Sequence, residues 1–144
     1  MHGKALGPKG WDNLKSRIRR GRAMSTFQAK RHGKQIKDPK QVPSSSADAL
    51  RVAMRLEGIP PQQYDDLLWI MAQESVGVPG VQNGSTTASG LFQMVEDARQ
   101  NFYPHGDASI GNPIEEAQGG IRYMLSRYGS AAGARKFWET HHWW

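Results

Sequence analysis

Residues 67–75 read Leu-Leu-Trp-Ile-Met-Ala-Gln-Glu-Ser, an apolar run that ends in a carboxylate and a hydroxyl. In a helix, residues spaced i, i+3, i+4 and i+7 share one buried face. Here those positions are Tyr64, Leu67, Leu68 and Met71, followed by Glu74 or Ser75. A charged carboxylate is costly to bury, so on this face the pKa of Glu74 should rise and the acid should keep its proton near neutral pH. Such an acid can protonate a leaving group. A lone glutamate more often points into water, and the spacing alone leaves both interpretations open.

The composition limits the classes of protein that fit this chain. Its 144 residues suit one compact domain plus an additional segment. The chain has no cysteine, which excludes disulfides, a thiol nucleophile and thiolate metal sites. No apolar stretch is long enough to cross a bilayer, and no apolar segment follows the basic residues near the N-terminus, so we expect no secretory signal peptide.

The charge is distributed unevenly along the chain. Residues 1–42 carry twelve Lys and Arg against two Asp, a net charge of +10, whereas residues 43–144 carry −4. We therefore predict a basic N-terminal arm and linker over 1–45 and a folded domain over 46–144. The arm is either a solvated tail or a segment that orders on an acidic partner, such as nucleic acid, an anionic membrane or an acidic protein surface. No nucleic-acid-binding fold is recognisable in it.

The domain is predicted to be mostly α-helical. Turn and cap residues place helices at about 47–57, from Pro60-Pro61 to about Val76-Gly77, from Asn112 to Gly129, and at about 131–140. Residues 39–46 look like a linker, and residues 78–89 like a loop or a short β-hairpin around Asn83-Gly84. Gly119 and Gly120 each cost a helix about 1 kcal/mol relative to alanine. Their compensation should be the close approach of another backbone or of a ligand.

Four motifs follow one another in the domain. They are Glu74-Ser75, Gly90-Leu91-Phe92-Gln93, Asn112-Pro113 and Gly120-Ile121-Arg122-Tyr123. In this order they resemble the soluble lytic transglycosylases of the lysozyme-like superfamily, which cleave bacterial peptidoglycan. The tail that ends in Trp143-Trp144 is more similar to versions found in phage structural proteins and actinobacterial cell-wall enzymes. Many members carry Ala-Tyr-Asn-Ala-Gly near the C-terminus, where this chain has residues 134–139, so those ligand contacts cannot be carried over.

The resemblance implies a role for each matching residue. Glu74 would be the sole catalytic acid/base, and the implied substrate-binding residues are Ser75, Gly90, Phe92, Gln93 and Tyr123. Ser75 would orient the carboxyl group or the sugar, unless it is only a helix-end hydroxyl. Gln93 would hydrogen-bond the saccharide, with a surface amide as the alternative. The resemblance implies that Tyr123 is a cleft tyrosine whose hydroxyl lies near the catalytic carboxyl. It lies off the main apolar stripe and is expected to face away from the main core, which suits that role; an ordinary partly buried tyrosine is the alternative.

The resemblance also implies the reaction. Glu74 would protonate the oxygen between N-acetylmuramic acid (MurNAc) and N-acetylglucosamine (GlcNAc), and the acetamido group would stabilise the positive charge. The ionised Glu74 would then deprotonate the 6-hydroxyl, which closes a 1,6-anhydro ring. One carboxyl group suffices for both steps, unlike the carboxylate pair of ordinary glycosidases.

Other polar and aromatic residues receive ordinary interpretations. We expect Glu96, Asp97 and Asp107 to be surface charges rather than a second catalytic carboxylate. Aromatic residues at helical spacing, such as Trp138, could stack on sugars but more often belong to the core. His105, His141 and His142 lack the spacing of metal ligands, so we predict no metal and no cofactor.

The arm and the missing signal peptide together suggest a protein carried in a larger assembly. We expect a phage virion, in which residues 1–42 would bind an acidic head, portal or tail protein or DNA. The enzyme would then act in the host cell wall or periplasm. A secretion or conjugation machine is the alternative carrier. Two other functions stay open, a hydrolytic muramidase on the same fold and a structural connector with a vestigial cleft.

Overall fold

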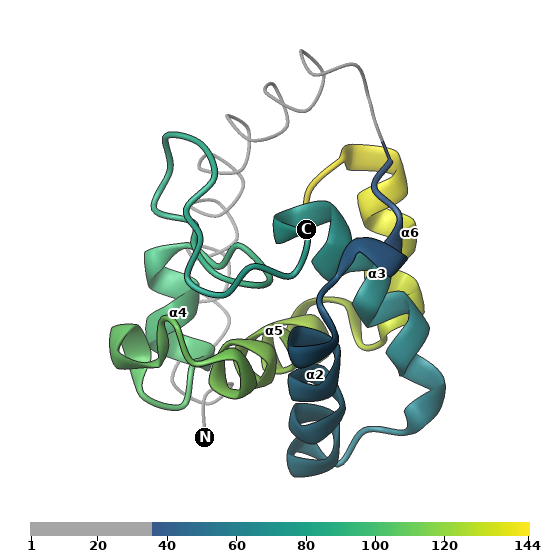
Figure 1. The fold of residues 1–144 in the computed structure, drawn as a ribbon, viewed down its shortest axis with the longest axis horizontal. Helices are drawn as coiled ribbons and strands as arrows, with labels where there is room; N and C mark the ends of the chain where they lie inside the picture. The colour runs from purple at the N-terminus through teal and green to yellow at the C-terminus, as the bar shows by residue number, and fades with distance from the viewer. Residues whose placement is uncertain (1–35) are drawn as a thin grey trace.

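The computed structural model describes residues 36–144 and shows a mostly helical domain (Figure 1). Its α-helices are α2 (Ser44–Glu57), α3 (Tyr64–Ser75), α4 (Glu96–Phe102), α5 (Pro113–Tyr128) and α6 (Ala131–His141). Three short 3-10 helices connect them, η1 (Pro39–Gln41), η2 (Pro61–Gln63) and η3 (Gly106–Ser109). The mostly helical class predicted from the sequence is confirmed. Most of the predicted basic arm, residues 1–35, lies outside the described residues.

The predicted helix ends follow from local chemistry. Gly58, with φ 70°, ends α2, and Gly129, with φ 79°, ends α5, because glycine enters the left-handed region without a Cβ clash. At the start of α5, the Asn112 side chain accepts a hydrogen bond from the Glu115 main-chain N–H, as predicted for an N-cap. Helix α3 ends at Val76 with φ 53°, a backbone conformation that a β-branched residue rarely adopts.

The predicted linker, residues 39–46, is instead packed against the domain. It forms η1 and the first turn of α2, and Val42 within it is buried. Lys37 and Gln73 exchange two hydrogen bonds, of 2.9 Å from the Lys37 N–H and 2.7 Å to its carbonyl. Ser46 Oγ donates to the Gly77 carbonyl at 2.6 Å. These contacts join the chain on both sides of η1 to α3 and to the residues directly after it, so the linker interpretation was wrong for this segment. The domain boundary at residue 45 remains a prediction.

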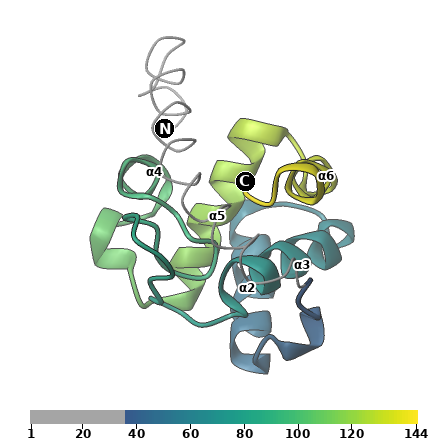
Figure 2. The same cartoon turned by 90° about the horizontal axis from the view of Figure 1, so that it is seen from above.

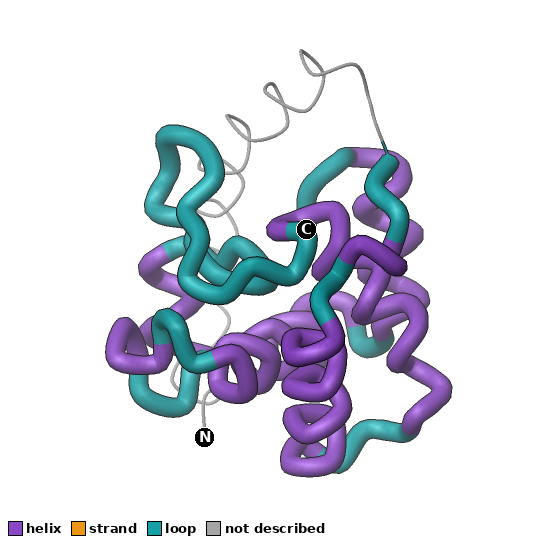
Figure 3. The backbone as a smooth tube through the Cα atoms, in the orientation of Figure 1, coloured by secondary structure: helices purple, strands orange, loops and turns teal. Residues whose placement is uncertain are grey.

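The loop between α3 and α4 contains no β-hairpin at Asn83-Gly84. Among the described residues the isolated β-bridge is between Ser89 and Met94, which enclose the Gly90–Gln93 motif in a tight turn. Figure 3 draws the whole segment as an irregular loop that extends away from the helices. The short helix α4, which the sequence pattern did not predict, follows this loop.

Helix α5 lies at the centre of the domain. In both views of the ribbon it runs between α4 on one side and the α3–α6 pair on the other, and α2 packs along it (Figures 1 and 2). A Cβ atom on Gly119 would overlap the Tyr103 ring, and one on Gly120 would overlap the Phe92 ring. The close approach predicted for these glycines is therefore real, but aromatic side chains make it rather than a backbone or a ligand.

The last residues of the chain close the core. Trp144 is buried, its indole N–H donates to the Phe92 carbonyl at 2.9 Å, and its ring lies 5.1 Å from that of Tyr123. Trp143 is also buried and packs edge-on to Phe137 at 4.8 Å. None of the described helices is both long and apolar enough to span a membrane.

Candidate active site

Glu74 occupies the last turn of α3 and is only 7 % exposed. The buried interpretation of the α3 stripe is therefore the one that the fold adopts. The Glu74 carboxylate Oε2 accepts a hydrogen bond of 2.7 Å from the indole N–H of Trp138 on α6. Its main-chain carbonyl accepts a bond of 3.2 Å from the side-chain amide of Asn83. Glu74 thus contacts both α6 and the long loop.

Ser75 connects the end of α3 to the Gly90–Gln93 turn. Its hydroxyl donates to the Leu91 carbonyl at 2.7 Å and accepts from the Gly77 N–H at 3.0 Å. The Leu91 N–H in turn donates to Glu116 Oε1 on α5 at 2.7 Å. The peptide groups on both sides of Leu91 are therefore fixed, one to the helix that carries Glu74 and one to the central helix. The role of Ser75 toward the sugar remains a prediction.

Glu116 is a fully buried carboxylate at the centre of this arrangement. Besides the Leu91 N–H, it accepts the N–H of Gly80 at 2.9 Å and that of Gly111 at 2.6 Å, both on Oε2. Burial raises the pKa of Glu116, and the three backbone hydrogen bonds oppose that rise. One side chain of α5 thereby holds three separate stretches of irregular backbone.

Gly90 and Gln93 shape the turn beside Glu74. Gly90 has φ 85°, and a Cβ there would come within 2.6 Å of the Glu116 carboxylate. The Gln93 amide donates to the carbonyls of Val81 at 2.8 Å and Gly90 at 3.0 Å, and its oxygen accepts the Asn83 N–H at 3.4 Å. The structure thus gives Gln93 contacts within the loop, and its bond to the saccharide remains a prediction.

Two predicted substrate-binding aromatics lie in the core. The Phe92 ring has no exposed surface and packs on Gly120 and on Trp144, whose ring is 5.2 Å away. Tyr123 is also buried, between the rings of Phe102 and Trp144, and its hydroxyl accepts a hydrogen bond of 2.9 Å from Arg127. The expectation that Tyr123 faces away from the core was wrong, because the C-terminal tail folds over the side of α5 that the stripe left open. Substrate contacts of both residues remain predictions.

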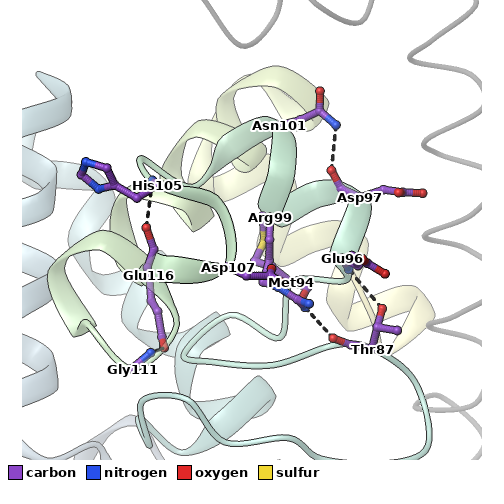
Figure 4. A network of polar contacts seen from close by, with 11 residues as sticks. Thr87, Met94, Glu96, Asp97, Arg99, Asn101, His105, Asp107, Gly111 and Glu116 are labelled. Carbon is purple, nitrogen blue, oxygen red and sulfur yellow. Dashed lines mark hydrogen bonds and ion pairs between the residues drawn. The ribbon is translucent and has the colours of Figure 1, made fainter.

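A buried arginine holds the far end of the loop. Arg99 of α4 donates to the carbonyls of Thr87 at 2.5 Å and Met94 at 2.7 Å, and pairs with Asp107 at 2.8 Å (Figure 4). Asp107, predicted as a surface charge, is half-exposed and serves as the partner of this arginine. Glu96 is exposed at the start of α4, where carboxylates favour the helix dipole.

The histidines and acids of residues 36–144 form no group of three that could hold a metal ion. His105 contacts Glu115 at 2.9 Å, and Glu115 also accepts a bond of 2.6 Å from the Ser109 hydroxyl. These two hydrogen bonds lower the pKa of Glu115, and the bond from Ser109 has the larger effect. The contacts of His105 and Ser109 with Glu115 join η3 to the first turn of α5.

The sequence patterns did not predict the roles of two residues, Trp138 and Glu116, that contact the site. Trp138 contacts the Glu74 carboxylate although 64 positions separate them, and periodicity assigned it to the core. Glu116 lies one position after Glu115 in the first turn of α5, where a glutamate ordinarily favours the helix dipole. One signal in the sequence could have identified Glu116. It lies four positions before Gly120 and therefore on the same face of α5, where a buried carboxylate would need hydrogen-bond partners.

A helical domain that buries one glutamate at the end of a core helix, beside a glycine-bounded loop, is consistent with the lysozyme-like class of glycan-cleaving enzymes. Within that class, the family model described as Transglycosylase SLT domain matches residues 48–143, and the chain belongs to this family. Its members are lytic transglycosylases, lyases that act on the glycan strands of peptidoglycan. No curated protein and no solved structure matches the chain.

Proposed function

We propose that the protein cleaves the MurNAc–GlcNAc β-1,4 bond of peptidoglycan and leaves 1,6-anhydromuramic ends, with Glu74 as the only catalytic acid/base. The observation that carries the proposal is the position of Glu74, buried at the end of α3 and hydrogen-bonded to Trp138. A carboxyl group held in this way is sheltered from bulk water, so it can both give and take a proton at a bound sugar.

The proposed reaction has two steps. First, protonated Glu74 gives its proton to the bridging oxygen, the bond from that oxygen to the anomeric carbon breaks, and the acetamido oxygen of MurNAc bonds to that carbon. Second, ionised Glu74 takes the proton of the muramyl 6-hydroxyl, whose oxygen displaces the acetamido group and closes the anhydro ring. Glu74 ends protonated, as it began, and no water is consumed.

The experiment compares Glu74→Gln with the wild type on purified peptidoglycan. We expect clearing of wall-containing gels to be lost, because an amide cannot exchange the proton. Glu96→Gln, which neutralises an exposed carboxylate of α4, is the matched control and should keep wild-type clearing. Unimpaired clearing by Glu74→Gln would refute the assignment. If the wild type and Glu74→Gln both fail to clear the gels, a connector with a vestigial cleft is the better interpretation.

The products separate a lyase from a hydrolase. Mass spectrometry of the digested wall should show muropeptides with anhydro ends, which are one water lighter than those with reducing ends. Reducing ends alone would instead identify a hydrolytic muramidase on the same fold.

We further propose that the enzyme is carried in a phage virion and opens the host cell wall or periplasmic peptidoglycan during genome entry. The support is the charge of residues 1–42, which carry +10 and would bind an acidic head, portal or tail surface or DNA. A secretion or conjugation machine would supply the same kind of acidic surface, and purification of the native particle distinguishes the two.

A further inference from the structure

Trp138 is the side chain that joins α6 to the carboxylate of Glu74. It is 5 % exposed, and its indole N–H lies 2.7 Å from Glu74 Oε2. An indole nitrogen can only donate, so this bond requires the oxygen that it meets to act as an acceptor. The bond is short and buried, which strengthens its electrostatic part relative to a bond in water.

The Trp138 indole is itself held in place by neighbouring aromatic rings. Trp69 of α3 packs edge-on against it at 5.3 Å, with the ring planes at 88°. The guanidinium of Arg135 lies 4.5 Å over the Trp69 ring and pairs with Asp66 at 3.2 Å. The His142 ring, just after the end of α6, is 5.2 Å from the Trp138 ring. An indole packed in this way has little freedom to rotate, so the direction of its N–H is fixed relative to α3.

A proton-transfer group must have a fixed direction as well as the right chemistry, because small misplacements of a reacting group reduce rates strongly. Glutamate has three side-chain torsions, and burial alone does not select one rotamer. A donor fixed on Oε2 selects the orientation of the whole carboxyl plane. It also stabilises the negative charge that Glu74 carries between the two steps of the reaction.

We propose that Trp138 is a positioning residue that holds the Glu74 carboxyl group in its reactive orientation through the indole N–H. This inference rests on the proposed function, because it requires Glu74 to be the acid/base. Trp138 acts on the reaction only through Glu74 and is not assigned a contact with the sugar.

The test is Trp138→Phe, which keeps an aromatic ring but removes the donor. On soluble glycan oligomers prepared from peptidoglycan, kcat should fall roughly 10- to 100-fold, the effect expected for a lost hydrogen bond to a charged group, while KM stays within about twofold. The matched control is Trp143→Phe, which makes the same substitution at a buried tryptophan that packs on Phe137, and it should keep kcat near the wild-type value.

A spectroscopic measurement covers the case in which Trp138→Phe does not fold. The indole N–H resonance of Trp138 in the 15N–1H spectrum should move clearly in Glu74→Gln and stay unchanged in Glu96→Gln. An unmoved resonance in Glu74→Gln would show that the contact is not made and would overturn the proposal. So would a wild-type kcat in folded Trp138→Phe.

The two proposals fail in different ways. If Glu74→Gln keeps full activity, the proposed function itself is wrong. If Glu74→Gln is inactive but folded Trp138→Phe turns over normally, Glu74 remains the acid/base and only the positioning role of Trp138 is lost.

Discussion

Glu74 and Glu116 are both buried glutamates, yet their partners give them different capacities. Glu116 accepts three main-chain N–H groups from three segments, so its two oxygens are committed to holding backbone. Glu74 lies at the end of a helix and meets a side-chain donor from α6. A carboxylate that accepts several backbone donors is suited to a structural role, whereas the proposed function requires Glu74 to exchange a proton with the substrate.

We predict that Glu116→Gln destabilises the domain by about 1–3 kcal/mol, the range for a buried polar group left without its partner. An amide presents an NH2 group where Glu116 now accepts N–H bonds on both oxygens, so at least one backbone donor must lose its acceptor. Urea denaturation measures the change, with Glu96→Gln as the exposed control. Equal urea midpoints for the two variants would show that the three hydrogen bonds of Glu116 do not stabilise the domain.

The stability contributed by Glu116 should also depend on pH. Burial raises its pKa above the ordinary value of 4.5, so the folded protein binds this proton more tightly than the unfolded chain. The contribution is therefore complete below about pH 4.5 and is lost as pH rises through the folded-state pKa. We expect the free-energy difference between wild type and Glu116→Gln to be larger near pH 4 than near pH 7. A difference that grows with pH would mean that the three N–H bonds outweigh burial.

At the level of elements, α5 is the helix on which the site is built. Its glycines admit the rings of Tyr103 and Phe92, and Glu116 on the same helix holds the turn that contains Phe92. Helix α5 therefore holds the Gly90–Gln93 motif through both a polar and an apolar contact, and Ser75 of α3 adds a second polar contact.

Gly120→Ala is predicted to destabilise the domain by about 1–3 kcal/mol, as expected for overpacking. Helix propensity alone would give the opposite sign, since alanine is favoured over glycine by about 1 kcal/mol. The new methyl group would displace the Phe92 ring, so activity should fall with stability. Ser126→Ala, on the exposed side of α5, is the control and should be neutral or slightly stabilising in thermal melts. A more stable Gly120→Ala would show that the ring can move freely.

The helices could largely be predicted from local signals, and the loop could not. Gly58, Asn112-Pro113 and Gly129 mark ends because cap and turn chemistry depends on neighbouring residues only. Helix α4 has seven residues and no side-chain cap, too short for a periodic pattern. The site was predicted in part, because a stripe can place Glu74 inside but cannot reveal Trp138, which reaches it from 64 residues away.

At the scale of the whole molecule, the C-terminal tail closes the domain. The Trp144 ring contacts Phe92, Tyr123 and Tyr128, which come from the loop and from α5. We predict that Trp144→Ala costs about 3–5 kcal/mol, the range for removing a large buried aromatic side chain. Thr140→Ala, on the exposed side of α6, should cost little. Chemical denaturation followed by circular dichroism compares the two, and similar stabilities would contradict a core role for Trp144.

The N-terminal arm gives a prediction for the complete chain. A deletion meant to remove only the arm should stop at residue 35. Lys37 already hydrogen-bonds to Gln73 of α3, and Val42 is buried in the domain. We expect the shortened protein to digest purified peptidoglycan normally and to be absent from the assembled particle. Normal incorporation without residues 1–35 would refute the docking role of the arm. Loss of lytic activity would show that the arm belongs to the enzyme.

The Leu91 N–H and the Leu91 carbonyl make the two hydrogen bonds that join the Gly90–Gln93 turn to Glu116 of α5 and to Ser75 of α3. Every amino acid has the carbonyl, and every one except proline has the N–H. The side chain at position 91 can therefore change over evolution, or in a designed library, without altering the hydrogen-bonding groups that connect α3 to α5. Apolar substitutions at this buried position change how the side chain fills the core while the two main-chain hydrogen bonds are kept, which makes position 91 a place to tune stability.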